Sequence, residues 1–169
     1  MIDRCGILKK LDLFHLLHHT KVQWHDGEPL FDKEKLETSA CLEYVLASCY
    51  KSLIFLIHNR NSRKEFQHLS QRSMIHQEQV MRLLGHEIDS EHNIELKREQ
   101  YLSNLNIDQL SVVGVLHLAI GMAEHTMDIY KYLSRTCPQY GSMLDCLVQD
   151  NMEEIDFLRG ELDFHQQKV

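Results

Sequence analysis

Apolar residues recur along most of the chain at spacings of three and four, which is typical of helices with one buried face. The pattern predicts two long helical hairpins, over about 32–85 and 107–166. The first begins at Asp32, a good N-cap, and its second helix opens with a capping box at Ser62-Arg63-Lys64-Glu65. We expect the third helix to start near 106–108 and the fourth to follow Pro138. The chain is therefore predicted to be all-α.

Two segments lie outside these hairpins. Residues 86–106 are charged, lack a strong apolar stripe and are too many for a tight turn. They can cross the length of a bundle even if they are partly helical, so we expect the second and third helices to be parallel. Residues 1–31 are predicted to form a helical arm and linker, in which Trp24 anchors the arm to the bundle (32–169) or to a second subunit.

The two hairpins carry special positions at matching intervals of 30 and then three residues. These positions are Glu43, Ser73 and His76 in the first hairpin, and Glu124, Glu154 and Phe157 in the second. The midpoint of Glu43 and His76 falls on the first predicted turn, and the midpoint of Glu124 and Glu154 falls on the second, so each pair would lie at one height. A carboxylate that faces an apolar core must pair, take up a proton or bind a cation. The sequence therefore predicts that Glu43, His76, Glu124 and Glu154 converge in the core.

Two explanations of such a cluster stay open from the residues alone. A divalent metal would offset the repulsion among the three acids, and imidazole and carboxylate are suitable ligands for it. Alternatively, one or two carboxyls are protonated, pair with His76 as imidazolium, or accept hydrogen bonds from Tyr50, Tyr130 and Ser73.

Over about 32–166 the chain resembles the ferritin-like proteins of the rubrerythrin and bacterioferritin kind, which are di-iron carboxylate four-helix bundles joined by one long crossover. The residues that carry the resemblance are Glu43 with Tyr50, Ala123-Glu124 with Tyr130, and the Asn-Met-Glu-Glu-Ile-Asp-Phe-Leu stretch at 151–158. The resemblance implies that Glu43 and Glu124 are terminal ligands and that Glu154 bridges two irons.

The sequence departs from that ligand set at two positions. Ser73 stands where the resemblance implies a second bridging glutamate, and Phe157 where it implies a second histidine. A site for one iron or manganese ion is therefore expected rather than a site for two. Its ligands would be Glu43, His76 and Glu154, with Glu124 as a fourth. Asp150, four residues before Glu154 and on the same helix face, could complete the site.

Two functions follow as hypotheses. The first is a metal-binding ferritin-like bundle, with an oxidoreductase or peroxide-handling role in which Tyr50 and Tyr130 support the metal or quench radicals. The second is a metal-free ferritin-like scaffold that serves as an interaction or dimerisation module. Whether the protein is an enzyme is left open, and no nucleotide, flavin or haem is expected.

Composition narrows the remaining classes. The net charge is −7 and no Lys/Arg cluster offers a phosphate track, so a nucleic-acid partner is not expected. Five cysteines without a CxxC pair are typical of reduced thiols and a cytoplasmic location, and they provide no second iron site of the rubrerythrin type. The N-terminal residues do not read as a signal peptide, and the longest apolar run is too short to span a membrane. A homodimer is expected because the arm has an apolar stripe.

Overall fold

The computed structural model describes residues 33–84 and 88–167. Within these ranges the chain forms α-helices and two short 3₁₀ turns, so the predicted all-α class is confirmed for this part. The elements are α2 (Lys33–Leu56), α3 (Arg60–Leu83), α4 (Ile88–Leu105), η1 (Ile107–Gln109), α5 (Val112–Thr136), η2 (Pro138–Tyr140) and α6 (Gly141–Gln166). The predicted arm over 1–31 with Trp24 and the predicted Asp32 cap lie outside the described residues.

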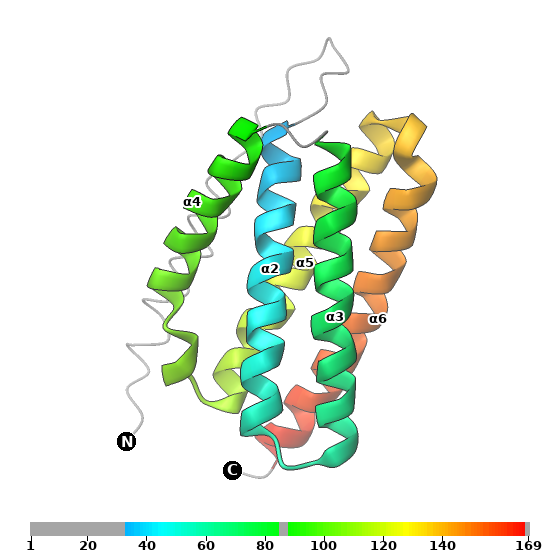
Figure 1. Ribbon diagram of the computed structural model, residues 1–169. Helices are drawn as coiled ribbons and strands as arrows, with labels where there is room; N and C mark the ends of the chain where they lie inside the picture. The colour runs from blue at the N-terminus through cyan, green and yellow to red at the C-terminus, as the bar shows by residue number, and fades with distance from the viewer. Residues whose placement is uncertain (1–32, 85–87, 168–169) are drawn as a thin grey trace. The chain divides into compact units, whose positions relative to one another are not determined.

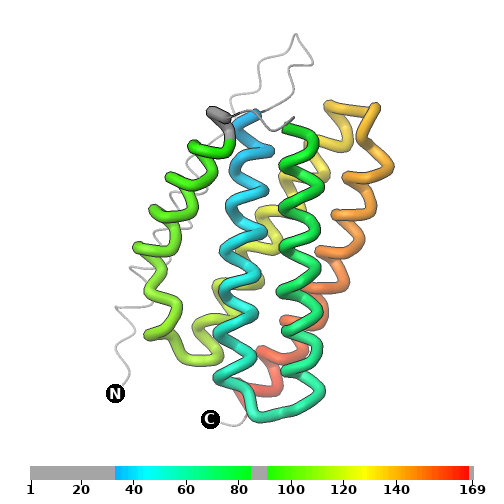
Figure 2. Tube along the Cα trace, in the orientation of Figure 1, coloured from blue at the N-terminus to red at the C-terminus, as the bar shows by residue number. Residues whose placement is uncertain are grey.

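The helices form two antiparallel hairpins (Figure 1). Helix α2 packs along α3, α5 packs along α6, and α2 also packs against α5. Helix α4 runs back along α2 and connects the end of α3 to the start of α5, as the trace shows (Figure 2). Helices α3 and α5 therefore run in the same direction.

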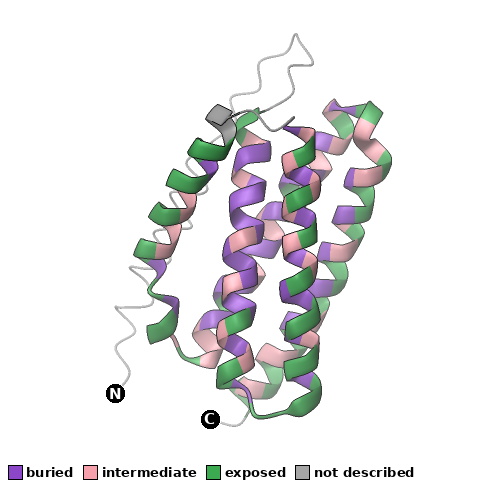
Figure 3. Ribbon diagram, viewed as in Figure 1, coloured by how far each residue is buried: buried purple, intermediate pink, exposed green. Residues whose placement is uncertain are grey.

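Helix α2 lies at the centre of this arrangement. It is buried on most of its surface because α3, α4 and α5 all pack against it (Figure 3). Cys41 and Cys49 are buried thiols on this helix, and burial raises the pKa of each to about 12. They are inert small core residues rather than redox partners.

The charged segment after α3 is helical along most of its length. Helix α4 buries Ile94 and Leu105 and lies against α2 through polar contacts. The buried Glu37 carboxylate of α2 accepts a bond from Asn93 Nδ2 at 3.3 Å and from Lys97 Nζ at 3.5 Å. Helix α4 has few buried apolar residues, and its contact with α2 therefore also depends on the pairing of the Glu37 carboxylate with Asn93 and Lys97.

Two helix starts differ from the prediction. The capping box at Ser62 to Glu65 is wrong, because the Asn59 side chain caps α3 three residues earlier by accepting from the Asn61 and Ser62 backbone N–H groups. Ser62 Oγ instead donates to Glu161 Oε1 of α6 at 2.8 Å.

Helix α5 also begins later than expected, at Val112. Asn106 has a left-handed backbone (φ 42°), which interrupts the helix before the η1 turn. Ser111 then caps α5 by accepting from Gly114 N at 3.2 Å.

Helices α2 and α5 are each long and apolar enough to cross a membrane, judged by length and composition alone. A core helix passes the same test, and 61% of the apolar window of α2 and 44% of that of α5 are buried within this structure. These two helices therefore do not decide whether the protein contacts a membrane.

Candidate functional site

A group of polar side chains meets between α2, α3, α5 and α6, and extends from the apolar interior to the bundle surface. We call it the core cluster, and its members are Glu43, Tyr50, Arg72, His76, Tyr130, Asp150 and Glu154. Glu43, His76 and Glu154 are almost completely buried. Three of the four ligands predicted from the sequence are thus brought together, each from a different helix.

His76 connects two carboxylates. Its Nδ1 lies 3.3 Å from Glu43 Oε1, and its Nε2 lies 3.1 Å from Asp150 Oδ2. Glu43 and His76 come level because the α2–α3 turn, between Leu56 and Arg60, lies midway between them in sequence. Asp150, which the sequence offered only as a neighbour, is therefore the partner that α6 supplies to His76.

Two tyrosines and one arginine satisfy most of the remaining carboxylate atoms. Tyr130 donates to Glu43 Oε1 at 2.9 Å, and Tyr50 donates to Glu154 Oε1. Arg72 Nη2 lies 3.5 Å from Glu154 Oε2 and donates to the Asp150 carbonyl oxygen at 3.1 Å.

The surroundings change the proton affinities of the cluster. Burial, together with the charge of Glu43, raises the pKa of Glu154 from 4.5 to about 7, although Tyr50, Arg72 and His76 oppose this. Burial alone would lower the pKa of His76, but its bonds and charges with Glu43 and Asp150 outweigh burial and raise it above 6.5. The two carboxylates beside His76 thus favour its imidazolium form, and Glu154 is partly protonated near neutral pH.

Several buried polar atoms in and beside the cluster have no hydrogen-bond partner. They are Glu43 Oε2, Ser73 Oγ, Asn151 Oδ1 and Arg72 Nε. An unpartnered buried carboxylate oxygen is costly, so Glu43 Oε2 is the atom at which a cation would be most favourable.

The core cluster offers fewer donor atoms than two metal ions would need. Glu43 offers a free oxygen beside His76 Nδ1, while the other ring nitrogen of His76 contacts a carboxylate, as in most metal-ligating histidines. Ser73 has no carboxylate for a second ion. Phe157 packs edge-on against the Phe66 ring at 5.3 Å. Among the described residues, no three or more His, Cys, Asp or Glu side chains are already arranged to hold a metal.

Glu124 does not join the cluster, contrary to the prediction. Its side chain is 43% exposed and forms an ion pair with Arg159 of α6, with Glu124 Oε1 2.7 Å from Arg159 Nη2. The buried face of α5 passes through Ala123, Thr126 and Tyr130, so Glu124 is rotated by about 100° from it. The face predicted to be buried was therefore about one residue out of phase at Glu124.

Arg72 is the member of the site that the sequence reasoning missed. It lies four residues before His76, so both side chains occupy one face of α3. That spacing could have placed Arg72 beside His76. It could not have identified Glu154 as the partner of Arg72, because that contact requires α6 to lie next to α3.

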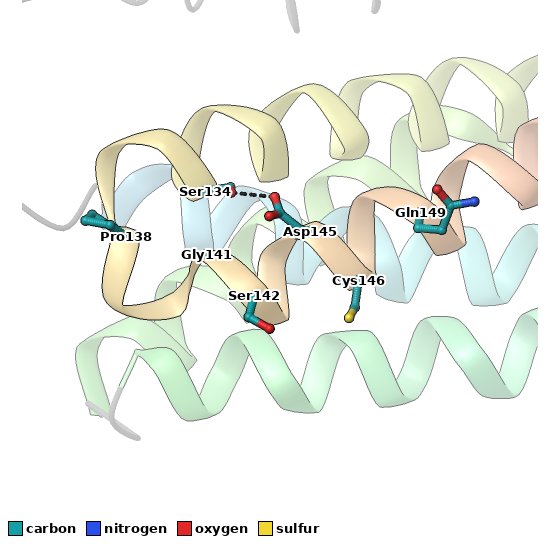
Figure 4. A pocket seen from close by; sticks show the side chains of 7 residues that line it. All are labelled: Ser134, Pro138, Gly141, Ser142, Asp145, Cys146 and Gln149. Carbon is teal, nitrogen blue, oxygen red and sulfur yellow. Dashed lines mark hydrogen bonds between the residues drawn. The ribbon is translucent and has the colours of Figure 1, made fainter.

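A separate surface depression of about 670 Å³ lies where α5, η2 and α6 meet (Figure 4). Ser134, Asp145 and Cys146 are among its lining residues, and Ser134 Oγ donates to Asp145 Oδ1 at 2.5 Å. No residue of the core cluster lines it, so it is no entrance to the buried site.

Comparison with known proteins found no matching family model, no matching curated protein and no matching solved structure.

Proposed function

We propose that the protein is a ferritin-like helical bundle whose core binds one iron or manganese ion. The ligands would be Glu43, His76 and Glu154, with Asp150 orienting His76. The observation that carries the proposal is the buried, unpartnered Glu43 Oε2 beside His76 Nδ1, whose other ring nitrogen contacts Asp150.

The electrostatics of the cluster support a cation. Burial and the charge of Glu43 raise the cost of ionising Glu154, and a divalent ion would offset that cost. Holding a divalent ion would require a neutral His76 and an ionised Glu154. Metal affinity is therefore expected to rise with pH as these protons leave.

The bundle's own residues would position the ion. Tyr130 donates to one oxygen of Glu43, and Tyr50 donates to one oxygen of Glu154. The second oxygen of each carboxylate would then be available to the ion, although Arg72 contacts that of Glu154 in this structure. Asp150 fixes the ring orientation of His76. Bound iron would supply one-electron redox chemistry, which is the basis of the oxidoreductase role included in the proposal.

The arrangement of the helices agrees with a ferritin-like bundle. Two antiparallel hairpins are joined by a long connection that leaves α3 and α5 parallel, and each hairpin contributes to the cluster. Fold analogy alone does not assign an activity, so the proposal depends on the cluster.

A specific observation favours the alternative of a metal-free scaffold acting as an interaction or dimerisation module. Arg72, His76 and the two tyrosines already contact the buried carboxylates, and protein cations can take the place of a metal in balancing charge.

Metal content after loading separates the two functions. Purified protein would be stripped with chelator, incubated with Mn²⁺, or with Fe²⁺ without oxygen, desalted and analysed for metal. The proposal predicts about one ion per chain, lost in Glu43→Gln and Glu154→Gln and retained in Glu153→Gln, an exposed neighbour on α6. Wild-type protein that retains no metal would leave the scaffold as the function.

A further inference from the structure

Arg72 places a positive charge at the edge of the core cluster, on the side where α3 faces α6. Its Nη2 lies 3.5 Å from Glu154 Oε2 and 3.1 Å from the Asp150 carbonyl oxygen. The next residue, Ser73, leaves Oγ buried and unpartnered, so the position of the missing bridging carboxylate is neutral. Compared with the two-metal site that the resemblance implies, the core cluster therefore has one carboxylate fewer, at Ser73, and an additional guanidinium, at Arg72.

We propose that Arg72 is a resident cation of this site, which holds Glu154 when no metal is bound and weakens the binding of a divalent ion. This inference rests on the proposed function and concerns its regulation. An arginine and a metal ion compete for the same carboxylate oxygen, and the charge of the guanidinium also repels an incoming cation. With Arg72 in place, one divalent ion would already neutralise the three carboxylates of the cluster, so a second ion would be repelled.

The guanidinium is placed so that it can be displaced. The Arg72 side chain is 27% exposed, whereas the Glu154 side chain is 1% exposed, so the arginine reaches in from the bundle surface. Its Nε makes no hydrogen bond, and its ion pair with Glu154 is long at 3.5 Å. Asp150, with a side chain 40% exposed, lies on the same α3–α6 side. An ion arriving between α3 and α6 would meet Asp150 and Arg72 before Glu43.

The competition can be measured by titrating chelator-stripped protein with Mn²⁺ at constant pH and ionic strength. The variants are Arg72→Gln, which removes the charge, and Arg82→Gln as a matched control, because Arg82 is an exposed arginine on the same helix. We expect Arg72→Gln to bind Mn²⁺ at least about tenfold more tightly than wild type and Arg82→Gln to stay within about twofold. Circular dichroism would check folding. Arg72→Met, which keeps the apolar stem, replaces Arg72→Gln if that variant does not fold.

Each outcome separates this inference from the proposed function. If wild type binds Mn²⁺ and the Arg72 variants bind no more tightly, Arg72 does not compete and the metal function stands. If only the Arg72 variants bind, Arg72 is the resident cation and the wild-type protein is the metal-free scaffold. If no protein binds, both proposals are overturned.

Discussion

Glu154 gives the sharpest test of the cluster in the absence of metal. Its folded-state pKa of about 7 lies above its ordinary value of 4.5, because the carboxyl is buried beside Glu43. The folded chain therefore keeps a proton that the unfolded chain releases. The resulting stabilisation is fully present below about pH 4.5 and is lost as the pH rises through about 7. At roughly 1.4 kcal/mol for each pH unit, that interval corresponds to about 3 kcal/mol.

The perturbation is Glu154→Gln, which keeps the side-chain shape and an acceptor for Tyr50 but does not titrate. The free energy of unfolding would be measured by urea denaturation in EDTA between pH 5 and 8, for wild type, Glu154→Gln and the exposed control Glu153→Gln. Wild type and the control should lose about 2.5 kcal/mol relative to Glu154→Gln over that range, because pH 5 already lies inside the interval between the two pKa values. The pKa of His76 is also raised, so its contribution to stability also decreases as the pH rises. This contribution is present in all three proteins, so the comparison isolates Glu154. Parallel profiles for wild type and Glu154→Gln would refute the burial of an ionisable Glu154.

Three further predictions concern the neighbours. Asp150→Asn should weaken Mn²⁺ binding by about 10–100-fold in the titration described above, because Asp150 orients His76; unchanged affinity would remove Asp150 from the site. Tyr50→Phe should lower the free energy of unfolding by about 1–3 kcal/mol at pH 8, because a buried carboxylate loses its donor. Tyr44→Phe is its control, because Tyr44 is a half-buried tyrosine on the same helix outside the core cluster, and equal losses in the two variants would argue against the Tyr50–Glu154 bond. Glu124→Gln should change stability by less than about 1 kcal/mol, because its ion pair with Arg159 is exposed, and a loss of metal in this variant would restore Glu124 as a ligand.

The sequence contained enough information for the helices and for one side of the site. Within a hairpin, the position of the turn determines which residues lie level, so Glu43 and His76 could be paired from their numbers alone. Glu154 was placed inward because the apolar residues Leu147 and Leu158 lie on the same face of α6, and the structure buries all three.

Helix α5 shows why the remaining ligand was misplaced. Apolar residues occur on more than one of its faces, so a stripe through Ile120 and Met127 looked as regular as the buried one. The buried stripe instead follows Ala119 and Ala123, small residues that carry a weak hydrophobic signal but allow α5 to pack closely on α2. The contacts of Arg72 and Asp150 depend on which helices are neighbours, and periodicity along one helix does not contain that information.

The most direct test of the central claim is the metal content of stripped, reloaded and desalted protein, measured by mass spectrometry and expressed as ions per chain. A buried site made by Glu43, His76 and Glu154 predicts about one manganese or iron ion per chain, absent in Glu43→Gln and kept in Glu124→Gln. Wild-type protein that holds no metal, or that holds the same amount after Glu43→Gln, would contradict it.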